Sequence, residues 1–194
     1  MLNLALAGRE LFPVAAQTLL GVAGQGAASV GEHFVHWAQL VNDSPLATSL
    51  RLSRYLFPII EGVHLLGLAF SVGLLLLVDL RLMGVFLRGE SAGQVLRQLR
   101  PVVIGGFIVT FATGLLLFAA SASDLIVSKV FLFKLIVLAL AGINASLFEF
   151  KLGRHRSTWA HPGRLPWQVK AAGWTSFVLW TAAVISGRMI PYLG

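Results

Sequence analysis

The feature that most constrains the fold is the apolar stretch over residues 55–80, which exceeds the roughly 20 residues that a helix needs to cross a bilayer. Glu61 and His64 lie well inside it. An ionisable side chain is costly in hydrocarbon, so we expect both to face protein, a cofactor or a water-filled cavity. At the helical period, Ser71 and Asp79 fall on the same face as this pair. The stretch therefore predicts a membrane span with one polar face.

The composition extends this prediction to the whole chain. Of the 194 residues, 57% are hydrophobic and 12% are charged, about half the charged share of a typical soluble domain. Four stretches are long and apolar enough to span a bilayer, at about 55–80, 101–122, 128–150 and 171–192. We therefore predict an all-α fold, an integral membrane four-helix bundle over residues 55–194. The chain has no Cys, which excludes thiolate and iron–sulfur sites built from it.

Residues 1–54 are predicted to form an N-terminal extension on the membrane surface. Residues 11–23 are apolar but short for a span, and fit an interfacial or re-entrant piece. Apolar residues then recur at helical spacing, which predicts an interfacial amphipathic helix, at Val30, Phe34, Trp37 and Val41. Either Asp43 or Ser44, followed by Pro45, is expected to start a second short helix.

The distribution of Lys and Arg predicts the orientation. The loops after the first and third spans carry nine of them, namely Arg81, Arg88, Arg97, Arg100, Lys151, Arg154, Arg156, Arg164 and Lys170. The opposite side carries Arg9, Arg51, Arg54 and Lys129. The positive-inside rule puts the first set in the cytoplasm and both termini outside. The net charge of +7 is thus a topology signal, and we expect the lipid bilayer rather than nucleic acid as partner.

In this orientation, polar residues of all four spans fall in the outer half of the bilayer. They are Glu61, His64, Thr113, Lys134 and Arg188. The functional hypothesis is a redox or cofactor site, in which His64 ligates haem iron or hydrogen-bonds a quinone and Glu61 orients the ring or relays a proton. Lys134 and Arg188 would neutralise an anionic group. The alternative is a Glu–His hydrogen bond that only locks helix packing, with both basic side chains reaching the interface.

The other polar residues carry weaker hypotheses. His33 and His36, three residues apart beside Glu32, could bind a copper or zinc ion. We interpret Asp79 and Arg81 as a topology anchor. Asn144 is interpreted as a hydrogen bond between helices, and His155 and His161 as solvated loop residues.

The residue count limits the kind of haem site. A haem held between histidines of two spans needs two intramembrane His, and only His64 qualifies. We therefore expect either a single His ligand or a haem shared by two copies of His64 in a symmetric dimer.

Several motifs resemble a known group of proteins. The run SPLATSLRLSRYLFPIIEGVHLLGLAFSVGLLLLVDLRLMG, with FATGLLLF, FLFKLIVLALAGINASLF and ISGRMIPY, resembles an uncharacterised bacterial family of small four-helix membrane proteins over about residues 34–194. More distantly, the His of span one, the Thr-Gly-Leu-Leu of span two and the Lys of span three resemble the copper-resistance D membrane domain and the haem-associated four-helix protoporphyrinogen oxidase. Those resemblances would map His64 and Lys134 to the cofactor or substrate pocket. The resemblance implies a multi-pass protein of the bacterial inner membrane.

Together, these features favour a membrane-embedded redox or cofactor-binding subunit, with haem b or quinone near His64, over a free-standing enzyme. We expect electron transfer within a homo-oligomer or a larger membrane complex. Two alternatives stay open. One is a structural or assembly subunit without cofactor, which docks through the small residues Gly62, Ala69 and Gly73 or through Thr110 and Gly114. The other is a copper-handling protein that uses His33, His36 and His64.

Overall fold

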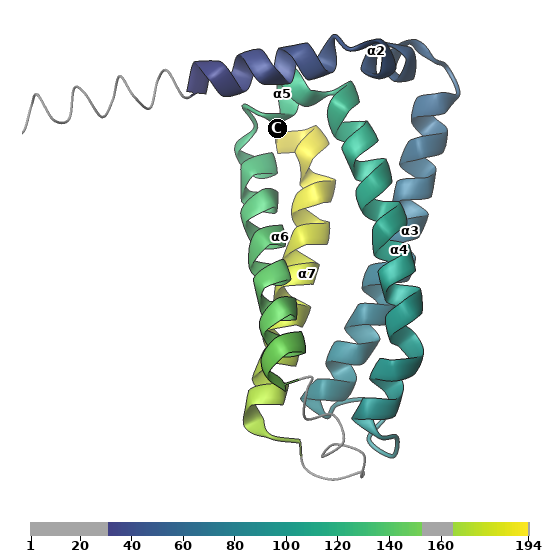
Figure 1. The fold of residues 1–194 in the computed structure, drawn as a ribbon, viewed down its shortest axis with the longest axis vertical. Coiled ribbons are helices and arrows are strands. Elements are labelled where there is room, and N and C mark those ends of the chain that lie inside the picture. Colours follow the sequence, from purple (N-terminus) through teal and green to yellow (C-terminus); the bar gives the residue numbers. More distant parts are fainter. Residues whose placement is uncertain (1–30, 153–164, 194) are drawn as a thin grey trace, which may run out of the picture.

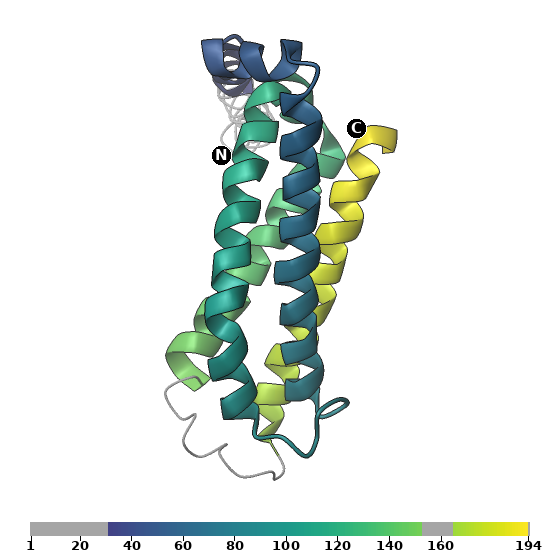
Figure 2. The same cartoon turned by 90° about the vertical axis from the view of Figure 1, so that its right-hand side faces the viewer.

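Four long helices run side by side in the computed structural model, which describes residues 31–152 and 165–193 (Figure 1, Figure 2). They are α3 (Leu56–Met83), α4 (Ala92–Ala120), α6 (Lys129–Leu147) with its π-helical continuation η1 (Phe148–Leu152), and α7 (Trp167–Leu193). Each is long and apolar enough to cross a membrane. The predicted all-α four-helix bundle is confirmed, and the chain is a multi-pass membrane protein. The predictions for residues 11–23, His155 and His161 lie outside the described residues.

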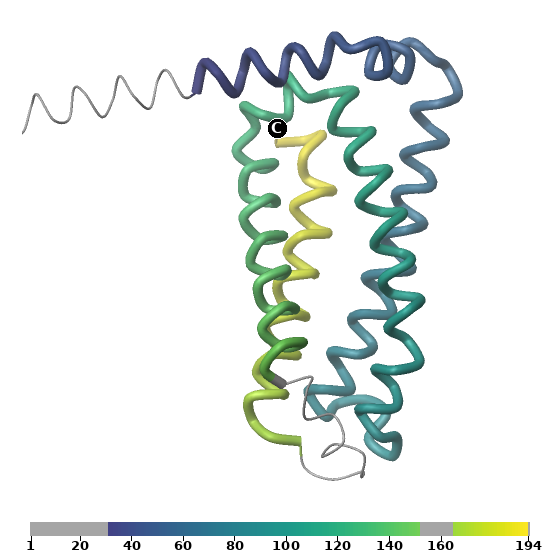
Figure 3. The backbone as a smooth tube through the Cα atoms, in the orientation of Figure 1, coloured from purple at the N-terminus to yellow at the C-terminus, as the bar shows by residue number. Residues whose placement is uncertain are grey.

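Short helices lie across one end of the bundle. The helical residues 31–42, α2 (Pro45–Leu52) and α5 (Ala122–Leu125) gather there, with the end of α7 close by (Figure 1, Figure 3). This outer end corresponds to the extracytoplasmic side in the predicted orientation. Ser44, rather than Asp43, caps α2, because its hydroxyl accepts from the Ala47 amide at 3.3 Å. The Trp37 ring stacks on Phe118 of α4 with centroids 6.3 Å apart.

The second span begins earlier than predicted. Helix α4 starts at Ala92, where Ser91 accepts from the Gln94 amide at 3.1 Å, so Pro101 lies inside the helix rather than opening it. The predicted start was too late because residues 92–100 contain several polar side chains, although they also include apolar residues at helical spacing. Ala92, Val95 and Leu96 are buried on one face against α3 and α7, at the inner end of the bundle.

The helices contact one another in the order α4, α3, α7, α6. Helices α3 and α4 approach most closely at small residues. A Cβ placed on Gly67 would lie 2.8 Å from Thr110 Oγ1, and one on Gly106 would lie 2.8 Å from Ser71 Cβ. The face of Thr110 and Gly114, which was predicted as a possible docking face for another subunit, therefore packs on α3 within the chain.

Helices α4 and α6 are joined near their ends. At the outer end, Phe118 of α4 stacks on Phe131 of α6, with centroids 5.5 Å apart. At the inner end, Arg100 of α4 forms an ion pair of 2.9 Å with Glu149 of η1. Between these contacts the bundle carries polar groups at two levels, one around His64 and one around Asp79.

Candidate functional site

His64 lies between α3 and α4 with one ring nitrogen fixed. Nδ1 lies 3.0 Å from the Thr110 carbonyl oxygen and 3.0 Å from the Thr113 hydroxyl. A carbonyl only accepts, so we assign the proton to Nδ1. The Thr113 hydroxyl donates to the Val109 carbonyl at 2.7 Å, which leaves its oxygen free to accept from Nδ1. In the neutral ring, the lone pair is then on Nε2.

The space for the imidazole is provided by a missing side chain on α4. A Cβ on Gly114 would lie 3.1 Å from His64 Cε1, tighter than ordinary van der Waals contact. The ring therefore rests directly on the α4 backbone, with Thr113 beside it. The sequence predicted that His64 and Thr113 share a depth in the membrane, but not that they are in contact.

Lys134 of α6 approaches the same level from the opposite side of the bundle. Its half-buried side chain lies over Gly187 of α7, where a Cβ would lie 3.3 Å from Nζ. The ammonium is close enough to His64 for an electrostatic interaction. Within residues 31–152 and 165–193, no hydrogen bond or ion pair to Lys134 is found. Three of the predicted site residues, His64, Thr113 and Lys134, thus gather at one level.

Glu61 and Arg188 do not join this group. The Glu61 side chain is exposed on the outside of α3 and interacts with His64 only electrostatically. Arg188 is exposed and lies 5.9 Å from the centroid of the Tyr192 ring. The ring of His64 is thus oriented by α4 rather than by Glu61.

The outer histidines stand apart from the bundle. His33 and His36 are both exposed on the helix of residues 31–42. Among the described residues, no group of three or more His, Cys, Asp or Glu could hold a metal ion. A metal at this pair would need a further ligand from elsewhere.

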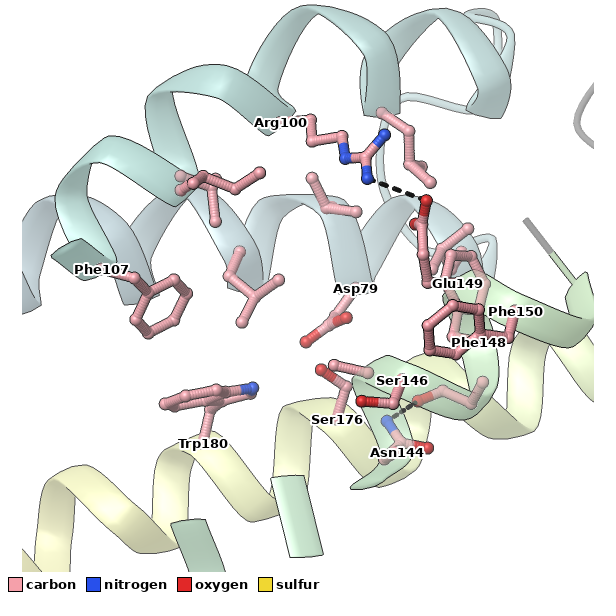
Figure 4. Close-up of a pocket in the computed structure, with 18 residues that line it drawn as sticks. Asp79, Arg100, Phe107, Asn144, Ser146, Phe148, Glu149, Phe150, Ser176 and Trp180 are labelled. Carbon is pink, nitrogen blue, oxygen red and sulfur yellow. Dashed lines mark hydrogen bonds and ion pairs between the residues drawn. The ribbon is translucent and has the colours of Figure 1, made fainter. Parts of the chain in front are cut away.

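A cavity lies nearer the inner end, where no site was predicted from the sequence. It has a volume of about 430 Å³ and is lined by all four long helices and η1 (Figure 4). Asp79 faces it with 2% of its surface exposed, and the Ser176 side chain lies close to the carboxyl group (Figure 4). Asn144 donates to the Ala172 carbonyl at 3.2 Å, joining α6 to α7 as predicted.

The interpretation of Asp79 and Arg81 as one anchor does not fit this arrangement. The Arg81 guanidinium turns away from the cavity, and its Nε donates to the Glu90 carbonyl in the α3–α4 loop at 2.9 Å. Asp79 points into the bundle instead. The sequence signal for this position of Asp79 is that it falls on the same helical face as Glu61 and His64.

Comparison with known families gives one match. Residues 56–193 match a family of unknown function (DUF6644). The chain belongs to this family. Comparisons with curated proteins and with solved structures gave no match. The matched region begins with α3 and ends with α7, so it contains both polar levels of the bundle.

The chemistry available to this DUF6644 protein differs between the two levels. The His64 level offers a nitrogen lone pair at Nε2 and a nearby ammonium on Lys134, which together suit a metal ion or a polarised oxygen compound. The Asp79 level offers a buried carboxyl group in a cavity.

Proposed function

We propose that this DUF6644 protein is a membrane-embedded cofactor-binding subunit, with His64 in contact with haem b or a quinone in the outer half of the bundle. One observation carries the proposal: Nδ1 is held by Thr110 and Thr113, so Nε2 is free to bind. Histidines that ligate metals characteristically donate their other ring N–H to a carbonyl or similar acceptor.

The residues fit a haem with one His ligand from each chain. His64 would bind the iron through Nε2, and Lys134 would hold an anionic propionate. A bound haem would supply one-electron transfer. A second ligand would come from His64 of another copy, consistent with a homo-oligomer.

The residues also fit a quinone. The Nε2 lone pair would accept the proton of a quinol hydroxyl, and the Lys134 ammonium would donate to a quinone carbonyl. Because α4 already fixes the His64 ring, the role left for the exposed Glu61 is a proton relay. Arg188, lying over Tyr192, would act only at the edge of the site.

The surroundings of the protein are part of this proposal. We propose the bacterial inner membrane as its location, and the positive-inside rule applied to the basic loops favours an extracytoplasmic His64 level. The resemblance of His64 and Lys134 to pocket residues of the copper-resistance D domain and the four-helix protoporphyrinogen oxidase supports a cofactor or substrate there.

A structural subunit is the second candidate, and an open face of α3 favours it. A Cβ on Gly62 or Gly73 would meet nothing within 4 Å, and Ala69 beside them is exposed. This stripe would allow a helix of another subunit to approach closely. Bulky residues at Gly62 and Gly73 would then prevent assembly, whereas His64→Ala would leave it intact.

The deciding experiment is an absorption spectrum of the detergent-purified protein, oxidised and dithionite-reduced, with quinone extraction from the same sample. We expect a Soret band that shifts on reduction, or co-purified quinone, and its loss in His64→Ala. The double variant His33→Ala/His36→Ala is the control and should keep the signal, because both side chains are exposed outside the bundle. A featureless spectrum with no extracted quinone would overturn the proposal.

A further inference from the structure

The inner cavity has a polar end and an apolar end along the helix axes. At the inner end lie Asp79, Ser176 and the Arg100–Glu149 ion pair, and toward the middle of the bundle lie Phe107 and Trp180 (Figure 4). The two aromatic rings pack with centroids 4.7 Å apart and close the apolar end. A volume of about 430 Å³ is within the range of small-molecule sites. This polarity matches a molecule with a polar head and an apolar tail.

The carboxyl group of Asp79 has an unused acceptor inside the cavity. Asp79 is 2% exposed, and Oδ2 is buried with no hydrogen-bond partner in the described part of the chain. A buried polar atom without a partner is costly. Arg100 is paired with Glu149 at 2.9 Å, so among the described lining residues Asp79 is the ionisable group without an ion-pair partner. The head group that fits is therefore a cationic donor.

The cavity opens toward lipid between α4 and η1. Two of its lining residues, Ile104 of α4 and Phe150 of η1, are 47% and 66% exposed on the outside of the bundle. Asp79 lies one turn before the inner end of α3, about 6 Å along the axis. A molecule lying in the inner leaflet would present its head group at this depth.

We infer that this cavity binds an amphiphilic amine from the inner leaflet, with Asp79 as counter-ion of the ammonium group and Phe107 and Trp180 against the apolar tail. The ammonium N–H donates to Oδ2, and the Ser176 side chain stays beside the carboxyl group. The site is separate from the His64 level and does not depend on the proposed cofactor.

The test uses the full chain in phosphatidylglycerol nanodiscs, which contain no lipid ammonium. The probe is N,N-dimethyl-4-phenylbutylamine, titrated by calorimetry. We expect Asp79→Asn to weaken binding about 10- to 100-fold, because a charged hydrogen bond is lost. Asp124→Asn is the matched control: it removes the same charge from an exposed residue of α5 and should bind like the wild type. Equal binding by Asp79→Asn would overturn the proposal.

A second measurement is independent of how the variant folds. Dicyclohexylcarbodiimide is lipophilic and adds to a protonated carboxyl group, and after acyl transfer the whole reagent is retained as an N-acylurea. Labelling of Asp79 in the wild-type protein is followed by peptide mass spectrometry. We expect the amine to slow this labelling at least about 10-fold, whereas its hydrocarbon isostere (5-methylhexyl)benzene should not. Equal protection by both compounds, or by neither, would overturn the proposal.

The source of the ammonium is decided by a third arm, with phosphatidylethanolamine added to the nanodiscs. Weaker apparent binding of the probe would identify a lipid head group as the occupant. Unchanged binding would identify a free amphiphilic amine. Either result leaves the ammonium site in place.

Discussion

The His64 level and the Asp79 level differ in how the bundle surrounds an ionisable side chain. Both place an ionisable group inside an apolar bundle. His64 is fixed by two contacts of 3.0 Å to α4 and rests on Gly114. Asp79 instead faces a cavity, where its Oδ2 has no hydrogen-bond partner among residues 31–152 and 165–193. A fixed ring with one free nitrogen suits a ligand of defined geometry. An open cavity with an unbalanced carboxyl group suits a ligand that brings the missing charge.

The difference originates in the packing of α4. From the middle of the bundle up to the outer level α4 lies close to α3, because Gly67 and Gly106 allow the backbones to approach. At the inner level α4 and η1 are joined across the cavity by a partly exposed ion pair. Close packing makes one site rigid, and its absence on the other side of α4 leaves room for the second.

The largest expected effect comes from breaking the close packing of α3 and α4. In Gly106→Ala the added Cβ would lie 2.8 Å from Ser71 Cβ, so the helices must separate. We expect this variant to be about 1–3 kcal/mol less stable than Gly105→Ala. Gly105 is the matched control because a Cβ there meets nothing within 4 Å. Unfolding in detergent measures the difference, and equal stability of the two variants would contradict the role of this contact.

Removing the Thr113 hydroxyl tests whether the fixed orientation of the His64 ring matters for cofactor binding at the outer level. Thr113→Val keeps the volume but loses the contact to Nδ1, while the Thr110 carbonyl remains. We expect haem or quinone affinity to fall about 10-fold, with amine binding at Asp79 unchanged. Thr175→Val, at an exposed position of α7, is the control. Cofactor titration decides, and wild-type affinity in Thr113→Val would show that the hydroxyl does not position the ring.

The sequence predicted the outer level better than the inner one. Helical rise fixes depth, so His64, Thr113 and Lys134 could be placed together. Rotation about the helix axis is set by packing that a single sequence does not reveal, and this is why Glu61, about 60° from His64 around α3, faces outward. Arg188 shares the depth but turns to Tyr192.

The inner cavity could not be predicted, because it depends on where α4, α6 and η1 diverge. The helical period put Asp79 on the same face as Glu61 and His64, but no local pattern distinguishes a carboxylate in a cavity from one in a packed interface. The start of α4 was missed for a different reason. Pro101 is a strong signal for a first turn, but the helix begins after the Ser91 cap instead.

Substitutions at the two levels should change the stability of the protein in opposite directions. Asp79→Asn removes a charge from a site where Oδ2 has no partner and keeps a group that can bond Ser176. We expect the ligand-free protein to gain about 1 kcal/mol, in contrast to His64→Ala, which loses packing and hydrogen bonds. Asp124→Asn, at an exposed position, should leave the stability unchanged. Thermal unfolding at neutral pH measures this, and a loss of stability in Asp79→Asn would mean that the carboxylate already has a stabilising partner.

The smallest effect on stability is expected at the ion pair beside the cavity. Arg100 and Glu149 are 49% and 38% exposed, so solvent screens their charges. A double-mutant cycle with alanine, followed by unfolding, should give a coupling free energy of about 0.2–1 kcal/mol.

The larger effect of this ion pair should be on access of small molecules to the cavity. Because the pair joins α4 to η1 next to the opening, Arg100→Ala should speed carbodiimide labelling of Asp79 while leaving the His64 level unchanged. Arg97→Ala, an exposed arginine on the same helix, controls for the loss of charge, and equal labelling rates in the two variants would show that the ion pair does not restrict the cavity.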